Sequence, residues 1–362
     1  MPVKQSTPPA ILRQRIAALV TEQAPTQRGD TVIVAVSGGP DSVALLHILC
    51  STLPLVRFIA VYVDHGLRPN ETGAEIELVQ ALAHQLQAGF ERVSVDVRTA
   101  VQQEKTSIEE TARTLRYQAL EAMRHQYQGT AIAVAHTADD QAEEILIRLI
   151  RGSGRKGLSG MQFKNSWVIR PLLHESKETL LYYLQVEQIP FSVDSSNLER
   201  TYLRNRVRLD LLPYLQDHFN KSIRQTLLQT TQILEDEEAL LEEMAGKAWQ
   251  EAVSVITIEP VPLEAPSHII QIDTKEFCKC HPALQRRILE KCCWQMEERP
   301  QFRQIELLLD LVHRRQGGAQ IHLSKGLRVH KRGRELIFSY PAGKCNYRGG
   351  MTGGSNDDER SS

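Results

Sequence analysis

The sequence predicts an α/β fold in which a parallel sheet has helices on both faces, followed by a helical connector and a smaller α+β domain. Over the first 214 residues, short apolar runs alternate with longer segments whose apolar residues have helical spacing. Most of the short runs are continuous, which is typical of strands buried on both faces. The predicted domains are residues 1–214, a connector at 215–252, an α+β domain at 253–340 and a disordered tail at 341–362.

The elements of the first domain follow in a regular order along the chain. The expected strands lie at residues 32–36, 58–63, 90–97 and 131–135, and the expected helices at 11–20, 75–86 and 107–128. A further helix starts near Val43, directly after the first strand. In such sheets a ligand binds beyond the carboxyl ends of the strands, near the point where the strand order reverses.

The character of the chain changes after Pro213. A long helical pattern covers residues 223–248, with an acidic stretch at 235–238 and no glycine until Gly246. This pattern predicts a connector helix. The next unit is expected to contain a strand, two helices and a closing hairpin, at residues 269–272, 284–297, 304–314 and 321–338. The tail after residue 340 has too little apolar content to fold.

The composition limits the class of protein. The chain has 362 residues, 41% of them hydrophobic, and a formal net charge of -1 at pH 7. It is long enough for two cores, and any RNA contact must come from local basic patches. The six cysteines have no Cys-x-x-Cys spacing, so reduced thiols are expected rather than a metal or redox site. With no apolar run of about 18 uncharged residues, we expect a cytoplasmic protein without membrane contact.

The loop after the first strand has the character of a phosphate-binding loop. It reads Ser-Gly-Gly-Pro-Asp-Ser over residues 37–42, between an apolar strand and a helix start. Two glycines let the backbone approach an anion, and the helix N-terminus adds positive potential. The loop is not a Walker A loop, because no lysine precedes Ser42, and it lacks the Gly-x-Gly-x-x-Gly spacing.

Two further polar clusters follow strands of the predicted sheet. Asp64 and His65 come after the second strand, and residues 136–144 follow the strand at 131–135. Within the latter, Asp140 and Glu143 share one helix face. Carboxylates beside phosphates can hold magnesium, and a spare one can act as a base toward an amine. A solvated acidic helix start explains Asp139 or Glu144 singly, but not the whole cluster at a strand end.

A basic, glycine-rich loop follows at residues 148–161. It has four basic residues, and no acidic residue occurs between Glu144 and Glu175. This composition suits contact with a phosphate backbone.

The motifs resemble known families at two levels. The Ser-Gly-Gly-x-Asp-Ser run resembles the pyrophosphate loop of ATP-pyrophosphatases, which activate a carbonyl-type oxygen with AMP. The complete set closely resembles the tRNA(Ile)-lysidine synthetase family over residues 30–215. The motifs that match are Val-Asp-His-Gly-Leu-Arg, Ala-Arg-x-x-Arg-Tyr, His-x-x-Asp-Asp-Gln-x-Glu, Arg-Gly-Ser-Gly-x-x-Gly-Leu, Arg-Pro-Leu-Leu, Asp-x-Ser-Asn and Arg-Asn-x-x-Arg.

This resemblance implies a two-step reaction at cytidine 34 of the tRNA(Ile) with a CAU anticodon. ATP would adenylate the C2 oxygen, and the side-chain amine of L-lysine would then replace AMP at C2. The implied cofactors are ATP and Mg²⁺, the implied fold is that of adenine nucleotide alpha hydrolases, and a homodimer is allowed. Longer family members carry a further carboxyl-terminal domain, which we do not expect after Phe338.

The resemblance also implies roles for individual residues. The catalytic candidates are Asp41, Arg113, His136, Asp140, Glu143, Arg204 and Arg208. ATP is expected to lie against Ser37, Gly38, Gly39, Pro40, Asp41 and Ser42, with Asp64 and His65 beside the adenosine and magnesium on Asp41 and Asp140. The expected RNA contacts are Arg151, Arg155, Lys156, Asn197, Asn205, Lys325, Arg328, Lys331 and Arg332. Among His136, Asp140 and Glu143, the roles of metal ligand, ammonium-binding group and general base stay open.

The motifs allow three other interpretations. A tRNA thiolation enzyme generally needs a pair of catalytic cysteines, and only Cys50 lies within residues 30–215. A small-molecule ligase would not need the basic loop and would turn over without RNA. A catalytically inactive RNA-binding module would not need Asp41, Asp140 and Glu143.

Overall fold

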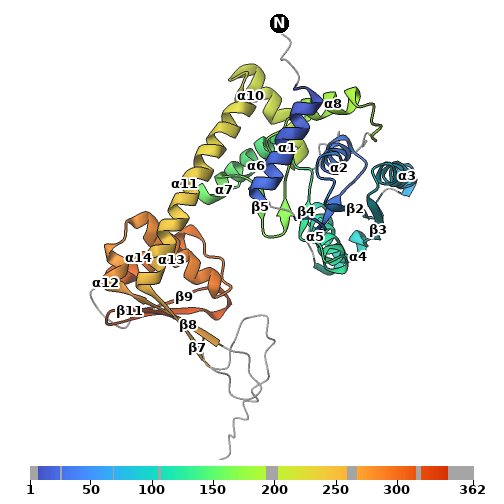
Figure 1. Ribbon diagram of the computed structural model, residues 1–362. Coiled ribbons are helices and arrows are strands. Elements are labelled where there is room, and N and C mark those ends of the chain that lie inside the picture. Colours follow the sequence, from blue (N-terminus) through green and yellow to red (C-terminus); the bar gives the residue numbers. More distant parts are fainter. Residues whose placement is uncertain are drawn as a thin grey trace, which may run out of the picture. The chain divides into compact units, whose positions relative to one another are not determined.

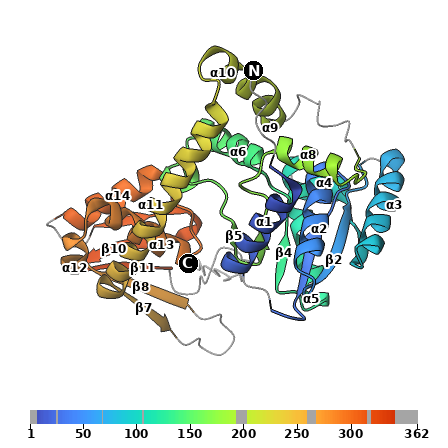
Figure 2. The ribbon, with the colours of Figure 1, turned by 45° about the horizontal axis from the view of Figure 1, so that its top comes forward.

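The computed structural model describes residues 7–24, 27–67, 69–104, 107–192, 203–258, 267–314 and 319–340. The chain forms two compact units, Met1–Glu235 and Asp236–Ser362. The division falls within one long helix, α11 (Ile223–Ala252), whose residues contribute to both units. Figure 1 and Figure 2 show the elements of each unit.

A six-stranded sheet forms the centre of the first unit, in the order β3-β2-β1-β4-β6-β5. All neighbouring strands are parallel except the antiparallel pair β5 and β6. Because β1 lies between β2 and β4, the strand order reverses there and creates a switch point. The strands are β1 (Thr31–Ala35), β2 (Arg57–Asp64), β3 (Gly89–Ser94), β4 (Ala131–Ala133), β5 (Lys164–Asn165) and β6 (Val168–Ile169).

Helices cover both faces of this sheet. Successive strand residues point to opposite sides, so the apolar strands present side chains to both layers of helices. Val32 and Val34 join the core beneath α1, α2, α3 and α8, whereas Ile33 packs on the other side with Leu120 of α5. These helices are α1 (Pro9–Gln23), α2 (Pro40–Thr52), α3 (Pro69–Gln85), α4 (Val97–Glu104), α5 (Ile108–Gln126) and α8 (Lys177–Val186). The chain adds β2 and β3 on one side of β1 and then crosses back to place β4 on the other side. Because parallel crossovers are right-handed, α2 and α3, which precede β3, and α5, which follows it, cover opposite faces of the sheet. The predicted α/β class is confirmed.

Local sequence signals set several helix starts. Pro40 is the first residue of α2, where its missing N–H breaks no helical hydrogen bond. Ser107 caps α5 by accepting a hydrogen bond from the Glu110 N–H, and Ser176 caps α8 in the same way through Thr179.

The remaining helices of the first unit gather around α6 (Ala138–Ile150). Leu146 and Ile147 of α6 pack on Val207 and Leu212. These partners belong to a segment made of α9 (Leu203–Arg206), the π-helix η2 (Val207–Leu211) and α10 (Leu212–His218). The short helix α7 (Arg155–Leu158) lies within the basic loop. The sequence did not predict α8, β5, β6 or this segment, because each is short and has little periodicity.

The second unit contains a five-stranded antiparallel sheet in the order β7-β8-β11-β10-β9. The strands are β7 (Val253–Ile258), β8 (Ser267–Asp273), β9 (Gln320–His322), β10 (Arg328–Arg332) and β11 (Glu335–Ser339), and the helices are α12 (Thr274–Lys279), α13 (Pro282–Gln295) and α14 (Phe302–His313). Ile270, Phe338 and Leu308 are among the residues of its core. The predicted α+β character is therefore confirmed, and the segment expected to be a hairpin at 321–338 is a three-stranded meander of β9, β10 and β11. The predicted disordered tail lies outside the described residues.

Among the described helices, none combines the length and the apolar character that crossing a membrane requires.

Candidate active site

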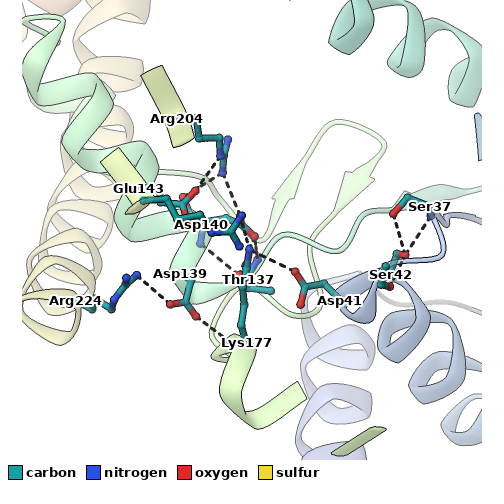
Figure 3. Close-up of polar contacts among 12 residues, drawn as sticks. Ser37, Asp41, Ser42, Thr137, Asp139, Asp140, Glu143, Lys177, Arg204 and Arg224 are labelled. Atoms are coloured by element: carbon teal, nitrogen blue, oxygen red, sulfur yellow. Dashed lines mark hydrogen bonds and ion pairs between the residues drawn. The ribbon is translucent and has the colours of Figure 1, made fainter. Parts of the chain in front are cut away.

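The loop between β1 and α2 is held in shape by its two serines. The Ser42 hydroxyl donates to the Gly39 carbonyl at 3.0 Å and accepts from the Ser37 N–H at 3.1 Å (Figure 3). Gly38 has φ +84°, in the region where a side chain is strained, and a Cβ there would lie 3.4 Å from Glu75 Cβ. Both observations agree with a backbone shaped for close approach of an anion.

The second polar cluster follows β4, the strand beside β1. Thr137 and Asp140 form a capping box at the start of α6, with Asp140 Oδ2 accepting from the Thr137 N–H at 2.9 Å and the Thr137 hydroxyl at 2.8 Å. These bonds leave Asp140 Oδ1 for other partners. The expected meeting of the two polar clusters at the carboxyl ends of β1 and β4 is observed at the switch point.

Lys177 joins the two clusters. Its Nζ lies 3.5 Å from Asp41 Oδ2 and 3.3 Å from Asp140 Oδ1. Its backbone N–H donates to Asp139 Oδ2 at 2.9 Å, and Asp139 Oδ1 accepts from Arg224 at 3.1 Å (Figure 3). Asp139 therefore fixes the backbone of Lys177, and Lys177 supplies the cation between the carboxylates of Asp41 and Asp140.

Two arginines neutralise the inner carboxylate, Glu143, whose side chain is 1% exposed. Arg204 Nε donates to Glu143 Oε2 at 3.0 Å, and Arg208 Nε forms an ion pair with Oε1 at 3.4 Å. Arg204 also lies 3.3 Å from Asp140 Oδ1. Arg208 belongs to η2, and π-helical turns are frequent at functional sites.

The three carboxylates have different proton affinities. Burial raises the pKa of Glu143 and so does the charge of Asp140, and both outweigh Arg204 and Arg208. Burial also raises the pKa of Asp41, against the opposing charge of Lys177. For Asp140, burial acts in the same direction, but Lys177, Arg204 and the Thr137 hydrogen bonds outweigh it, and the pKa falls below its ordinary value. Glu143 is therefore a better proton acceptor than Asp140.

His136 is held by Arg170 rather than by a carboxylate. Arg170 Nε donates to His136 Nδ1 at 3.1 Å, and Arg170 Nη1 donates to the Gln162 carbonyl at 2.9 Å. Arg113, on α5, lies over the Tyr117 ring with its Cζ 5.2 Å from the centroid. Its charge acts on His136 and lowers the pKa of that imidazole.

The residues expected to bind magnesium fit that ion. Asp41 Oδ1 is buried without a hydrogen-bond partner, while Oδ2 of the same group and Asp140 Oδ1 face one cation, Lys177. Among the described residues, no group of three or more histidine, cysteine, aspartate or glutamate side chains could hold a metal. Mg²⁺ commonly takes one or two carboxylates and completes its coordination with phosphates and water.

The expected adenosine contacts lie at the end of β2, the strand on the other side of β1. Asp64 Oδ1 accepts from the Gly66 N–H at 2.9 Å, and Oδ2 pairs with Arg92 at 2.7 Å. His65 follows, partly buried. Tyr62 of the same strand donates to Glu75 of α3 at 2.6 Å.

The expected RNA-binding residues are distributed over both units. Arg151, Arg155 and Lys156 are exposed at the basic loop, which Arg148 anchors by donating to the carbonyls of Gly157 and Gly160. Asn205 lies on α9 beside Arg204. In the second unit, Arg328 and Arg332 are exposed on β10, and the Lys331 Nζ donates to the carbonyls of Val312 and Arg314 near the end of α14. The backbone of Lys325 lies in η3 (Ser324–Gly326), and Asn197 lies outside the described residues.

Sequence reasoning missed several residues of this site. Lys177, Arg224 and Glu75 were not predicted, and Arg170 was noted only as part of a motif. Lys177 lies 37 residues from Asp140 along the chain, and Arg224 lies 85 residues from Asp139. The Arg-Pro-Leu-Leu motif at residues 170–173 was a signal that could have pointed to this region, because it directly follows a strand of the sheet, β6.

Comparisons with known proteins agree with this geometry. A family model described as the PP-loop domain matches residues 9–215. The chain is 31% identical over 332 residues to a tRNA(Ile)-lysidine synthase from Symbiobacterium thermophilum, covering 88% of this chain and 67% of the relative. It is 27% identical over 319 residues to one from Clostridioides difficile, covering 86% and 67%. The matches span about half to two thirds of the length of such curated relatives.

Among solved structures, the chain is similar to a U34-tRNA thiolase from Methanococcus maripaludis. The TM-score is 0.52 at 15% sequence identity, over 62% of this chain and 78% of the other. At that identity the similarity describes the fold alone.

Proposed function

The chain belongs to the PP-loop family and, within it, to the tRNA(Ile)-lysidine synthases, and on this premise we propose that it joins L-lysine to cytidine 34 of tRNA(Ile) with a CAU anticodon. The reaction would use ATP and release pyrophosphate and AMP. Lysidine would pair with A instead of G, so the codon read would change from AUG to AUA and the amino acid from methionine to isoleucine. The cytoplasmic location and the homodimer expected from the sequence stay predictions.

One arrangement carries this proposal. At the switch point, a phosphate-type loop with Asp41 faces Asp140 across the Lys177 ammonium, and the buried Glu143 lies one helical turn further along α6. An anion site, paired carboxylates and a carboxylate with a raised pKa are the groups that adenylation followed by amine attack requires.

In the first proposed step, the cytidine C2 oxygen attacks the α-phosphorus of ATP. An oxygen–phosphorus bond forms, the bond from that phosphorus to the bridging oxygen breaks, and pyrophosphate leaves with the electron pair. The backbone of the loop at residues 37–42 and the N-terminus of α2 would hold the departing anion. Asp41 and Asp140 would hold Mg²⁺, which would supply positive charge to the phosphates.

In the second proposed step, the lysine amine attacks C2. A carbon–nitrogen bond forms, the carbon–oxygen bond to AMP breaks, and AMP leaves. A lysine side chain is an ammonium at neutral pH, so it must first lose a proton. We assign this proton to Glu143, because its pKa is raised, whereas the pKa of Asp140 is lowered and His136 Nδ1 already accepts from Arg170. Arg204 and Arg208 would compensate negative charge beside the leaving AMP.

The proposed RNA contacts are exposed basic side chains in both units. Arg151, Arg155 and Lys156 carry exposed positive charge on one loop of the first unit, and Arg328 and Arg332 carry it on β10. Basic side chains of this kind position a phosphate backbone without reading sequence. Discrimination of the anticodon would need further contacts to bases.

The thiolation alternative lacks support in the described residues. Within the described part of the first unit, Cys50 is the free cysteine; it lies on α2, partly buried against the core. Burial raises its pKa to about 12. A partly buried thiol with a raised pKa is a poor nucleophile.

The test supplies the protein with ATP, Mg²⁺ and labelled L-lysine, and compares a tRNA(Ile) transcript with a CAU anticodon against elongator tRNA(Met). We expect label to enter the first RNA only, together with release of AMP and pyrophosphate. Entry of label into neither RNA, with RNA-dependent ATP cleavage retained, would leave the adenylation chemistry and reject lysine as acceptor.

A further inference from the structure

The Nδ1 atom of His136 faces the guanidinium of Arg170. Arg170 Nε lies 3.1 Å from His136 Nδ1 in hydrogen-bonding geometry. Arg170 is 8% exposed and is oriented by its second bond, at 2.9 Å to the Gln162 carbonyl. Its direction of approach is therefore fixed by the backbone between α7 and β5.

A guanidinium has five N–H donors and no acceptor. In a hydrogen bond with Arg170, His136 Nδ1 must therefore be the acceptor and cannot carry a proton. The neutral imidazole then has its single proton on Nε2. A doubly protonated ring would place an Nδ1–H against an arginine N–H, so this contact also opposes the cationic form.

We propose that Arg170 is a positioning residue that locks His136 in the Nε2–H form, so that His136 donates a hydrogen bond to a substrate oxygen and is neither the general base nor a metal ligand. This inference rests on the proposed function for the identity of the substrates, but its structural core concerns two side chains of the resting protein. The oxygen it serves is one on which negative charge develops, such as a phosphate oxygen or the oxygen that leaves C2.

The surrounding charges act in the same direction as this lock. Burial lowers the pKa of His136 to about 3, and the charges of Arg170, Arg113 and Arg116 add to that effect against the opposing charge of Asp140. The ring is therefore neutral over the whole range in which the enzyme would work. A neutral donor can stabilise developing negative charge without a proton having to be bound first.

The direct test is the tautomer of His136 in the protein without substrates. With ¹⁵N-labelled histidine, long-range proton–nitrogen NMR correlations distinguish an unprotonated Nδ1 from an unprotonated Nε2, and the His136→Gln spectrum assigns the signal. We expect the Nε2–H form in the wild type between pH 6 and 8. In Arg170→Met we expect a mixture of the two neutral tautomers, because burial still keeps the ring uncharged, whereas Arg170→Lys, which keeps a cationic donor, restores the Nε2–H form.

Arg13→Met is the matched control. Arg13 is another partly buried arginine of the first unit, paired with Glu187 at 2.8 Å and remote in sequence from His136. Its loss should leave the tautomer unchanged. An Nδ1–H form, or a cationic ring above pH 6 in the wild type, would overturn the proposal, as would an Arg170→Met spectrum equal to that of the wild type.

Activity gives a second readout. The amide nitrogen of glutamine reaches about as far as histidine Nε2 and is also a donor, so His136→Gln should keep part of the rate of RNA-dependent pyrophosphate release. His136→Ala should lose about 10²- to 10³-fold, as for removal of one donor to an oxyanion. Equal loss in both variants would contradict donation by Nε2. If the wild type shows no RNA-dependent ATP cleavage, the proposed function fails, and the tautomer measurement still decides this inference.

Discussion

Both units of the molecule present clusters of basic side chains, but they use them differently. At the switch point of the first unit, Lys177, Arg204 and Arg208 are directed at carboxylates that are largely buried. On β10 of the second unit, Arg328 and Arg332 are exposed, while Lys331 caps the carbonyls at the end of α14. Basic side chains therefore have three structural roles here: they pair with buried carboxylates, bind backbone carbonyls or stay exposed. These roles are distinguished by the burial and the partners of each side chain.

The comparison predicts that the largest effects on chemistry come from the buried carboxylates. Asp41→Asn should reduce RNA-dependent pyrophosphate release on the order of 10⁴-fold, because a metal ion contributes several kcal/mol of charge stabilisation and this variant weakens its site. The exposed Asp96→Asn is the control and should keep the wild-type rate. Wild-type release by Asp41→Asn, measured at saturating ATP, would remove this loop from the reaction.

Glu143→Gln should separate the two steps. Loss of the base should slow lysine incorporation by about 10²- to 10³-fold, whereas pyrophosphate release in a single turnover should be much less affected, so adenylated RNA would accumulate. The control is Glu187→Gln, which removes a partly buried carboxylate that is also paired with an arginine. Equal slowing of both steps in rapid-quench experiments would assign Glu143 to the adenylation step instead.

Glu143→Gln also tests whether the negative charge of Glu143 stabilises or destabilises the folded protein. A carboxyl whose pKa is raised in the folded state contributes stability below its unfolded pKa and loses it as the pH rises through the folded value. The folded pKa of Glu143 is raised, so its ionised form costs stability at neutral pH. We expect Glu143→Gln to have a higher Tm than the wild type at pH 7.5, with the difference shrinking toward pH 4. A lower Tm at pH 7.5 would show that the two arginine pairs outweigh burial.

In the second unit, the exposed arginines should affect binding rather than chemistry. Arg328→Ala and Arg332→Ala should each weaken RNA binding several-fold, and each should lower the slope of log K against log salt by about 1. Arg303→Ala, at an exposed position of α14, is the control. Unchanged salt slopes in titrations from low to moderate salt would show that β10 does not contact RNA.

The smallest expected effect is that of Lys331→Met. Its ammonium donates to two carbonyls near the end of α14, so its loss should cost about 1 to 2 kcal/mol of stability in the second unit. RNA affinity should change little. Lys275→Met, at an exposed position of α12, should leave the Tm unchanged. A loss of affinity as large as that of Arg332→Ala would show that Lys331 contacts RNA as well.

The sequence predicted the parts of the site that are local. The loop at residues 37–42 and the cluster from His136 to Glu143 each follow a buried strand, and the strand order of α/β sheets places such ends together. Lys177, Arg170 and Arg224 could not be found in this way, because they reach the site through contacts between residues far apart in the chain. A strand of two residues, such as β6, gives no periodic pattern. Because β6 was not predicted, nothing in the sequence placed the helix that carries Lys177 beside the sheet.

The two carboxylate oxygens of Asp140 have different structural roles: one caps a helix, and the other faces the cations of the site. Oδ2 is bound by the Thr137 N–H and hydroxyl at the first turn of α6, and Oδ1 faces Lys177 and Arg204. The bonds that start the helix therefore also restrict the rotation of this side chain. Ordering a side chain at a binding site costs roughly 0.5 to 1.5 kcal/mol. For Asp140 that loss of rotamer entropy accompanies folding, so a ligand that binds Oδ1 meets a group whose direction is already set.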